Sequence, residues 1–343
     1  MRRKTRRRGG VRGWLVAILI LIPILWVGYW FAAHTVANAA VDRITSRPVG
    51  GGRIACTAHS LGGFPLRLDF GCDRAAYADV SGQQVSAELA SLKASAPLYW
   101  PGYVETRLGS PFVVNAPGMG VALTAQWSAA STTTSAGLGG LQSAGAAFDG
   151  LDFASTGSAE LPLRNLRATR AEAFVEPAGG NSYRLAAFAN DLQVLPADGR
   201  TIPPFSTEAR IVALDFASSL GTDPRETVLH WLRTGGTANV ERLKLTTGDA
   251  GFDADGQLTL GPDGVLAGKL NLRLRNPEAF GDFAEAIRPG TREKLEQILP
   301  VLMALTIPVN TPDGPARQTA LIIRKGVVSI GIVPIGTIPP LKF

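Results

Sequence analysis

Apolar and polar residues alternate with a period of two along much of the chain after residue 50. The alternation is clear over 64–70 and even more regular over 266–275. This pattern is typical of a β-strand that buries one face and exposes the other. Weaker patterns of the same kind predict further strands at about 112–115, 121–128, 149–155, 163–175, 182–195, 209–217 and 238–248. Most of the chain is therefore predicted to form an antiparallel sheet.

Turn signals join some of these strands into hairpins. The sequence Gly-Pro-Asp-Gly at 261–264 is a turn sequence, because proline fixes one backbone angle and glycine tolerates unusual ones. We therefore predict a hairpin over residues 256–275. A last hairpin is predicted over about 319–332, around the Lys-Gly pair at 325–326.

Helix signals are few and lie late in the chain. The sequence Asp-Pro-Arg-Glu at 223–226 combines a cap, a first-turn proline and an acidic residue, and it predicts a helix that ends near Gly235. The sequence Asn-Pro-Glu at 276–278 begins a second predicted helix, which Pro289 ends. Thr291 begins a third, with apolar residues on one face.

One stretch between these segments has an ambiguous composition. Residues 128–147 are rich in Ala, Ser, Thr and Gly, which predicts a loop or a weak helix and marks a candidate boundary between two halves. The predicted fold class is mainly β (α+β). It is a large curved antiparallel sheet with a few late helices, preceded by one transmembrane helix.

A segment of 20 residues without charge, 14–33, precedes the β-rich part. A helix rises about 1.5 Å per residue, so this length crosses the hydrocarbon core of a bilayer. The tail 1–13 has basic but no acidic residues, which keeps it in the cytoplasm. We predict a single-pass protein of the bacterial inner membrane, with a linker at 34–52 and a periplasmic β-rich domain at 53–343. Aromatic residues suit the two membrane interfaces: Trp14, Trp26, Tyr29 and Trp30.

A cleaved signal peptide is the alternative interpretation of this segment. The sequence Ala-Asn-Ala at 37–39 resembles a signal-peptidase site. The apolar run, however, exceeds the roughly 7–15 residues of a signal core. We therefore favour a retained anchor, and cleavage stays open at this point.

The charge is concentrated in the tail. The chain has 34 basic and 28 acidic residues, a formal net charge of +6. Seven basic residues lie in 1–13, which leaves 27 basic residues against 28 acidic ones in the rest. A neutral body gives no support for phosphate binding, so nucleic acid is not a predicted partner. The predicted partners are the membrane and lipid acyl chains.

The chain carries few groups suited to catalysis or metal binding. Three His and two Cys are too few for a zinc or iron-sulfur site, and no nucleophile elbow, metalloprotease helix or phosphate loop appears. His59 and His230 are the histidines beyond the predicted span that could act as a base. The turn-like sequence Asp-Ala-Asp-Gly at 253–256 lacks the later ligands of a calcium loop. We predict no catalytic residue, metal or cofactor, and no enzymatic activity.

The two cysteines, Cys56 and Cys72, enclose 15 residues and are predicted to lie in an oxidising compartment. A disulfide between them is predicted, and closing such a loop would stabilise the fold by about 3 kcal/mol. A tight turn at 62–63 would instead place Cys56 opposite residue 69, so the bond requires a wider loop or a diagonal contact. A redox-active pair is disfavoured, because the Cys-x-x-Cys spacing is missing.

The apolar faces of the strands require a covering. They either pack into a core or leave a groove open to acyl chains, and the few helices favour the groove. Tyr99, Trp100 and Tyr103 surround a Pro-Gly turn and are candidate contacts with lipid or a membrane interface. The alternative is that this cluster covers an edge of the core.

Several segments together resemble a known family: Arg-Ile-Ala-Cys at 53–56, Gly-Phe-Pro-Leu-Arg-Leu at 63–68 ending at Cys72, Ala-Pro-Gly at 116–118, and the late Asp-Gly hairpin. They resemble an uncharacterised family of membrane-anchored alphaproteobacterial proteins, domain of unknown function 2125. That family is in turn similar to the AsmA-like envelope proteins. The resemblance implies curved β-sheets that form lipid-conducting grooves, and it carries over no catalytic residue. This chain is shorter, so it would form only part of a conduit across the periplasm.

The predicted function follows from export together with many amphipathic strands. We expect the periplasmic domain to bind or pass lipid in maintenance of the cell envelope. The alternative is a non-catalytic scaffold or assembly factor that docks a membrane complex through the edge of its sheet. A hydrolase with an unrecognised site is a third hypothesis.

Overall fold

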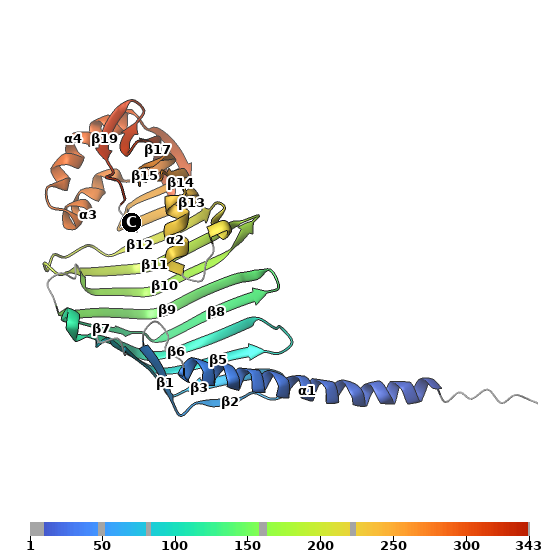
Figure 1. Cartoon of the computed structure of the whole chain (residues 1–343). Coiled ribbons are helices and arrows are strands. Elements are labelled where there is room, and N and C mark those ends of the chain that lie inside the picture. The colour runs from blue at the N-terminus through green and yellow to red at the C-terminus, as the bar shows by residue number, and fades with distance from the viewer. Residues whose placement is uncertain (1–9, 47–51, 80–83, 158–162, 220–223, 342–343) are drawn as a thin grey trace, which may run out of the picture.

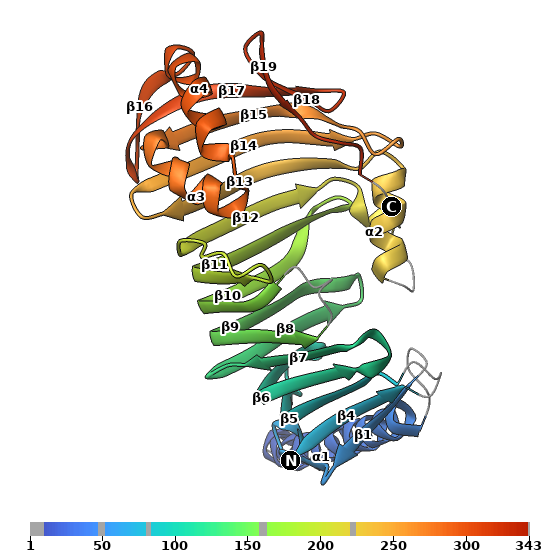
Figure 2. The same ribbon diagram turned by 90° about the vertical axis from the view of Figure 1, so that its left-hand side faces the viewer.

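The computed structural model describes residues 10–46, 52–79, 84–157, 163–219 and 224–341, with the backbone alone at 10–17, 218–219 and 224–225. Its largest part is one antiparallel sheet that twists and curves from the strands beside the N-terminal helix to the C-terminal hairpins (Figures 1 and 2). The predicted fold class is confirmed. The predicted helix cap at residue 223 and the residues 1–9 of the tail lie outside the described residues.

The strands pair almost entirely in chain order. The first nine are β1 (Gly52–Thr57), β2 (Ser60–Gly62), β3 (Arg67–Cys72), β4 (Arg74–Asp79), β5 (Ser86–Pro97), β6 (Tyr103–Ala116), β7 (Val121–Gln126), β8 (Ala129–Gly137) and β9 (Gly140–Gly157). β3 and β4 follow one another end to end along one edge of β5, and β7 and β8 both lie between β6 and β9.

The rest of the sheet continues from β9 by successive pairing. Its strands are β10 (Leu163–Gly179), β11 (Ser182–Pro196), β12 (Phe205–Ala213), β13 (Thr237–Thr247), β14 (Ala250–Leu260), β15 (Leu266–Arg275), β16 (Ile307–Thr311), β17 (Gly314–Arg324), β18 (Val327–Ile330) and β19 (Val333–Thr337). β17 pairs with β15 on one side and with β16 and β18 on the other. The predicted hairpins around 261–264 and 325–326 are confirmed.

The helices are α1 (Gly10–Ser46), α2 (Pro224–Arg233), α3 (Phe280–Ile287) and α4 (Thr291–Ala304), with short 3-10 turns at 117–119, 216–219 and 277–279. The three late helices begin and end close to the predicted positions. α2 begins with Pro224, which favours the first helical position, and α4 follows Gly290, which adopts a positive φ.

The first helix is longer than predicted. α1 continues through most of the predicted linker as far as Ser46, and over Ile18–Ser46 it is long and apolar enough to cross a membrane. Residues 34–46 are rich in alanine and lack Gly and Pro, so nothing in their composition stops the helix. Only 47–51 of the predicted linker separates α1 from the sheet, and that segment lies outside the described residues.

The prediction for 128–147 was wrong. These residues form β8 and most of the first half of β9, not a loop or a weak helix. Small residues have low strand propensity, yet here they pair on both sides, β8 with β6 and β9 with β10. Ladder hydrogen bonds from two neighbours override a weak local preference.

Two smaller differences concern the strand ends. Phe64 and Leu66 lie in the turn before β3, because the strand begins only at Arg67. The predicted strand 209–217 ends at Ala213 and leads into the 3-10 turn at 216–219. Both errors extend an alternating pattern into a turn that happens to contain apolar residues.

The two faces of the sheet differ sharply from β9 onward. One row of directly opposed residues crosses eight strands and holds almost only apolar side chains: Ala146, Ala173, Ala187, Ala209, Leu243, Ala254, Leu272 and Thr319. The neighbouring row on the same face is Ala144, Val175, Leu185, Ile211, Val240, Gly256, Leu270, Leu321 and Ile330. We call this the apolar face, and the opposite one the charged face.

Candidate functional site

The C-terminal helices cover part of the apolar face. In Figure 2, α3 and α4 lie in front of the strands β13 to β15. Phe280 and Phe283 on α3 project toward Phe252 of β14 and Phe205 of β12, with ring centroids 6.3 Å and 5.3 Å apart for the pairs Phe252–Phe280 and Phe205–Phe283. These rings attach the helix pair to the sheet.

A groove of about 490 Å³ remains between the helices and the sheet, and we call it the helix-covered groove. Its lining is almost entirely hydrocarbon: Phe252, Leu272, Leu274, Pro277, Phe280, Phe283, Ala284, Ile287, Leu295 and Leu302. Arg288 and Thr291 are the polar residues of the lining. Small-molecule sites in proteins are usually concave and mostly apolar. The groove can therefore accept an apolar chain and offers little to a polar ligand.

A single carboxylate holds the start of α4 against α3. Glu285 on α3 accepts hydrogen bonds from the backbone N–H groups of Gly290, Thr291 and Arg292 at 2.9–3.0 Å. These bonds to the ionised carboxylate lower the pKa of Glu285. The same contact satisfies otherwise unpaired N–H groups at the helix N-terminus and favours its dipole. Glu285 therefore determines how the two helices sit over the groove.

The apolar face continues beyond the groove toward the middle strands. Ala173 on β10 and Ala187 on β11 are exposed, and Leu185 beside them is 43% exposed. Side chains of this size leave the face shallow and open there. The apolar face is therefore covered by helices over β14 and β15 and open over β10 and β11.

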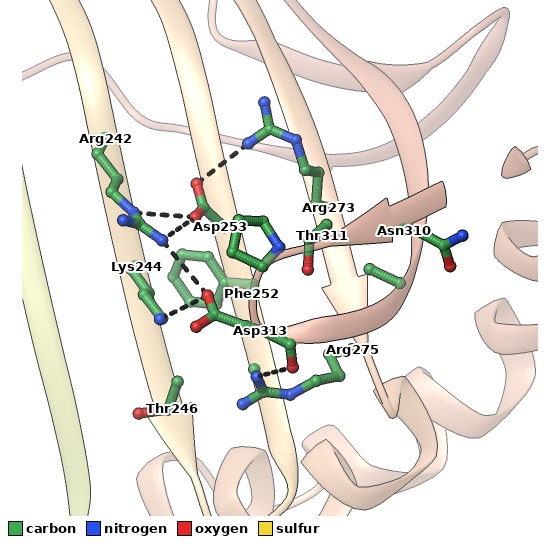
Figure 3. A pocket seen from close by; sticks show the side chains of 13 residues that line it. Arg242, Lys244, Thr246, Phe252, Asp253, Arg273, Arg275, Asn310, Thr311 and Asp313 are labelled. Carbon is green, nitrogen blue, oxygen red and sulfur yellow. Dashed lines mark hydrogen bonds and ion pairs between the residues drawn. The ribbon is translucent and has the colours of Figure 1, made fainter. Parts of the chain in front are cut away.

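The charged face carries the ion pairs of the sheet. Arg242 on β13 and Arg273 on β15 both bind Asp253 of β14, at 2.7 Å and 3.2 Å (Figure 3). Arg273 also binds Asp255. The prediction that 253–256 form a turn was wrong, because these residues lie in the middle of β14 and their carboxylates face the arginines of the neighbouring strands.

The turn between β16 and β17 folds over this face and closes a pocket of about 310 Å³. Asp313 in that turn binds Lys244 at 2.6 Å and Arg242 at 3.4 Å, and Arg275 donates to its main-chain carbonyl at 3.1 Å (Figure 3). The hydrogen bond from Lys244 lowers the pKa of Asp313. Each charged group of the pocket already has a partner within the protein. The pocket therefore works as a structural clasp between the hairpin of β16 and β17 and strand β13.

The predicted disulfide is present. Cys56 of β1 and Cys72 of β3 are joined, with 5.7 Å between their Cα atoms. The hairpin is wider than the tight turn at 62–63: Gly62 pairs with Asp69, and Cys56 lies opposite Ala75 of β4. The loop is thus wider than the tight turn, and the bond joins two strands that no described ladder pairs with each other.

The predicted aromatic contacts lie at the turn between β5 and β6. Tyr99 is 70% exposed, and Trp100 is exposed as well. Trp100 stacks on Tyr103, the first residue of β6, with ring centroids 5.0 Å apart. The structure thus brings the three residues together. It places them at the opposite end of the sheet from the helix-covered groove (Figure 1).

The histidines do not form a site with one another. His59 lies in the turn after β1 and His230 on α2, and both are exposed. His34 contacts Asn38 and the ring of Trp30 on its own helix. Among the described residues, no group of three or more His, Cys, Asp or Glu side chains could hold a metal ion.

Sequence reasoning favoured an open groove but missed that α3 and α4 would wall it, although part of the signal was visible. The apolar positions of α4, including Leu295 and Leu302, were recognised as one face of a helix. Phe280, Phe283 and Ile287 on α3 show the same spacing of three and four residues. A search for two successive amphipathic helices after the last long strand would have found both walls.

The comparisons with known proteins identify the family to which this chain belongs. No curated protein and no solved structure matches the chain. A family model described as an uncharacterized protein conserved in bacteria matches residues 30–339, from the outer part of α1 to just beyond β19. Because this match spans most of the chain, the protein belongs to the DUF2125 family.

Proposed function

We propose that this protein is held in the bacterial inner membrane by α1 and that its periplasmic sheet binds lipid acyl chains without catalysing a reaction. The observation that carries the proposal is the continuous apolar face, which runs across the strands from β9 to β17 and passes beneath α3 and α4. Contact between apolar surface and water is unfavourable in free energy, so an exposed apolar face favours the binding of an apolar ligand.

The anchor is supported by the way α1 joins the fold. The helix passes without a break through residues 37–39, the candidate cleavage site. Trp30 is 7% exposed, and its indole N–H donates to the carbonyl of Arg67 at 3.1 Å. Cleavage after residue 39 would remove this contact from the sheet. The disulfide also suits an oxidising compartment such as the periplasm.

The ligand class is supported by the chemistry of the groove. Its lining offers dispersion contacts to a hydrocarbon chain and very few hydrogen bonds. The first apolar row runs from the open strands to Leu272 of β15, which lines the groove. An acyl chain could therefore lie along the face and reach beneath the helices, as the resemblance to AsmA-like proteins also implies.

Lipid binding can be tested on the full chain, purified from membranes in a mild detergent. Native mass spectrometry is expected to show bound phospholipid. The variant Ala284→Phe fills the groove and is expected to lower the bound fraction at least severalfold. Ala279→Phe is the matched control, because Ala279 is exposed in the short turn before α3 and does not line the groove.

Two results would contradict the proposal. One is a protein that carries no lipid and takes up none when phospholipid is added. The other is equal lipid binding by the two variants, which would place the lipid elsewhere. A stoichiometric protein partner without lipid, found by crosslinking in membranes, would favour the scaffold hypothesis instead.

A further inference from the structure

The outer part of α1 is bound to two turns of the sheet. The indole N–H of Trp26 donates to the carbonyl of Pro65 at 2.8 Å, and the Tyr29 hydroxyl donates to the carbonyl of Leu98 at 3.4 Å. These turns, at 63–66 and 98–102, are also joined to each other, since the N–H of Leu98 donates to the carbonyl of Leu66 at 2.9 Å. Helix and turns therefore form one unit.

The two turns are unusual in their composition. They contain no acidic and no basic residue, whereas turns in contact with water are commonly rich in polar residues. Phe64, Leu66, Tyr99 and Trp100 are each more than half exposed, and we call these four residues the apolar rim. Stacking on Tyr103 keeps the ring of Trp100 in place. Contiguous exposed apolar groups of this kind mark an interaction surface.

The position of the rim identifies its partner. Tryptophan and tyrosine in a membrane helix gather at the interface between lipid and water, and Trp26, Tyr29 and Trp30 lie near the outer end of the predicted span. The rim lies at the level of these residues because the turns bond to them. In Figure 1 the turn between β5 and β6 lies on the side of the sheet toward which α1 extends.

We propose that the apolar rim inserts into the outer interface of the membrane that α1 spans. The partner is thus a lipid surface, and the rim is a second attachment beside the anchor. One helix alone would let the sheet tilt and rotate, whereas a helix and an inserted rim fix its orientation. This inference rests on the proposed anchor and is independent of lipid binding in the groove.

The test uses the full chain in phosphatidylcholine and phosphatidylglycerol vesicles, with an environment-sensitive fluorophore on a single introduced cysteine. The native cysteines are joined and do not react. The label is placed by Tyr99→Cys in the rim, by Leu21→Cys in α1, and by Ile332→Cys in the turn between β18 and β19. Ile332 is the control for mere exposure, because it is 97% exposed and directly precedes β19, which lies at the end of the sheet far from α1 in Figure 1.

Lipids with brominated acyl chains are expected to quench the labels at 99 and 21 and to leave the label at 332 unchanged. Quenching at 21 with none at 99 would overturn the rim proposal and leave the anchor intact. Absence of quenching at 21 would overturn the anchor and the rim together. Protection of the label at 99 from a water-soluble quencher without quenching by lipid would indicate contact with a second copy of the chain and would also overturn the proposal.

Discussion

At the scale of single residues, Asp313 connects the hairpin of β16 and β17 to strand β13. Lys244 and Arg242 on β13 both bind the carboxylate of Asp313, and the hydrogen bond from Lys244 lowers the pKa of Asp313. A carboxyl group with a lowered pKa stabilises the folded state at pH values above its ordinary pKa of about 3.9. That contribution is lost as the pH falls through the lower pKa of the folded state.

We expect Asp313→Asn to loosen the hairpin of β16 and β17 at neutral pH. Hydrogen exchange of the amides in 307–324 should be faster in the variant. The amide exchange rates of the wild-type hairpin should approach those of the variant only well below pH 4, when Asp313 is protonated. Asp249→Asn is a suitable control, because Asp249 accepts from Arg275 through its main-chain carbonyl and not through its carboxylate. Equal exchange in wild type and Asp313→Asn at pH 7 would refute this role.

At the scale of elements, the disulfide joins β1 to β3 at the end of the sheet that α1 contacts. The element β1 has a single strand partner, β4, among the described pairings. A strand held on one side is easily lost unless it is tied down. The bond between Cys56 and Cys72 supplies that tie and reduces the freedom of the unfolded chain.

We expect the double variant Cys56→Ala, Cys72→Ala to lower the free energy of unfolding by about 3 kcal/mol, the value for a loop of this length. Urea denaturation in detergent measures the change, with intrinsic fluorescence as the signal. Reductant should destabilise the wild type by a similar amount and leave the variant unaffected. An unchanged urea midpoint in the variant would show that the bond contributes nothing to stability.

At the scale of the whole molecule, one long helix and one continuous sheet determine where each surface can act. The helix-covered groove and the apolar rim lie at opposite ends of the sheet (Figure 1). A lipid that enters from the membrane would therefore have to move along the open apolar face. If the sheet binds lipid as proposed, the alanines of β9 to β12 would leave room for an acyl chain on this part of the face.

The orientation of the whole chain can be tested with fusions at its C-terminus. A phosphatase that is active only after export should be active there, and a fluorescent protein that matures only in the cytoplasm should stay dark. The basic tail 1–13 is the physical reason to expect this orientation. Replacing its seven basic residues with neutral ones is expected to produce a mixture of orientations. A cytoplasmic C-terminus in the unmodified chain would contradict the entire placement.

The sequence by itself determined those features that depend on neighbours along the chain. The period-two alternation of 266–275, the Gly-Pro-Asp-Gly turn and the uncharged run of 14–33 each act locally, so the strand, the hairpin and the long apolar helix could be predicted. The prediction was wrong for 128–147, because weak strand formers become strands when both neighbours supply hydrogen bonds.

Only the tertiary structure decided which surfaces meet. The groove requires α3 to fold back onto β14 and β15, and the rim requires Pro65 and Leu98 to lie against Trp26 and Tyr29. These partners are separated by tens of residues, and their contact depends on strand register and on the curvature of the sheet. Neither quantity is contained in a local pattern, because a long sheet accumulates its twist over many strands.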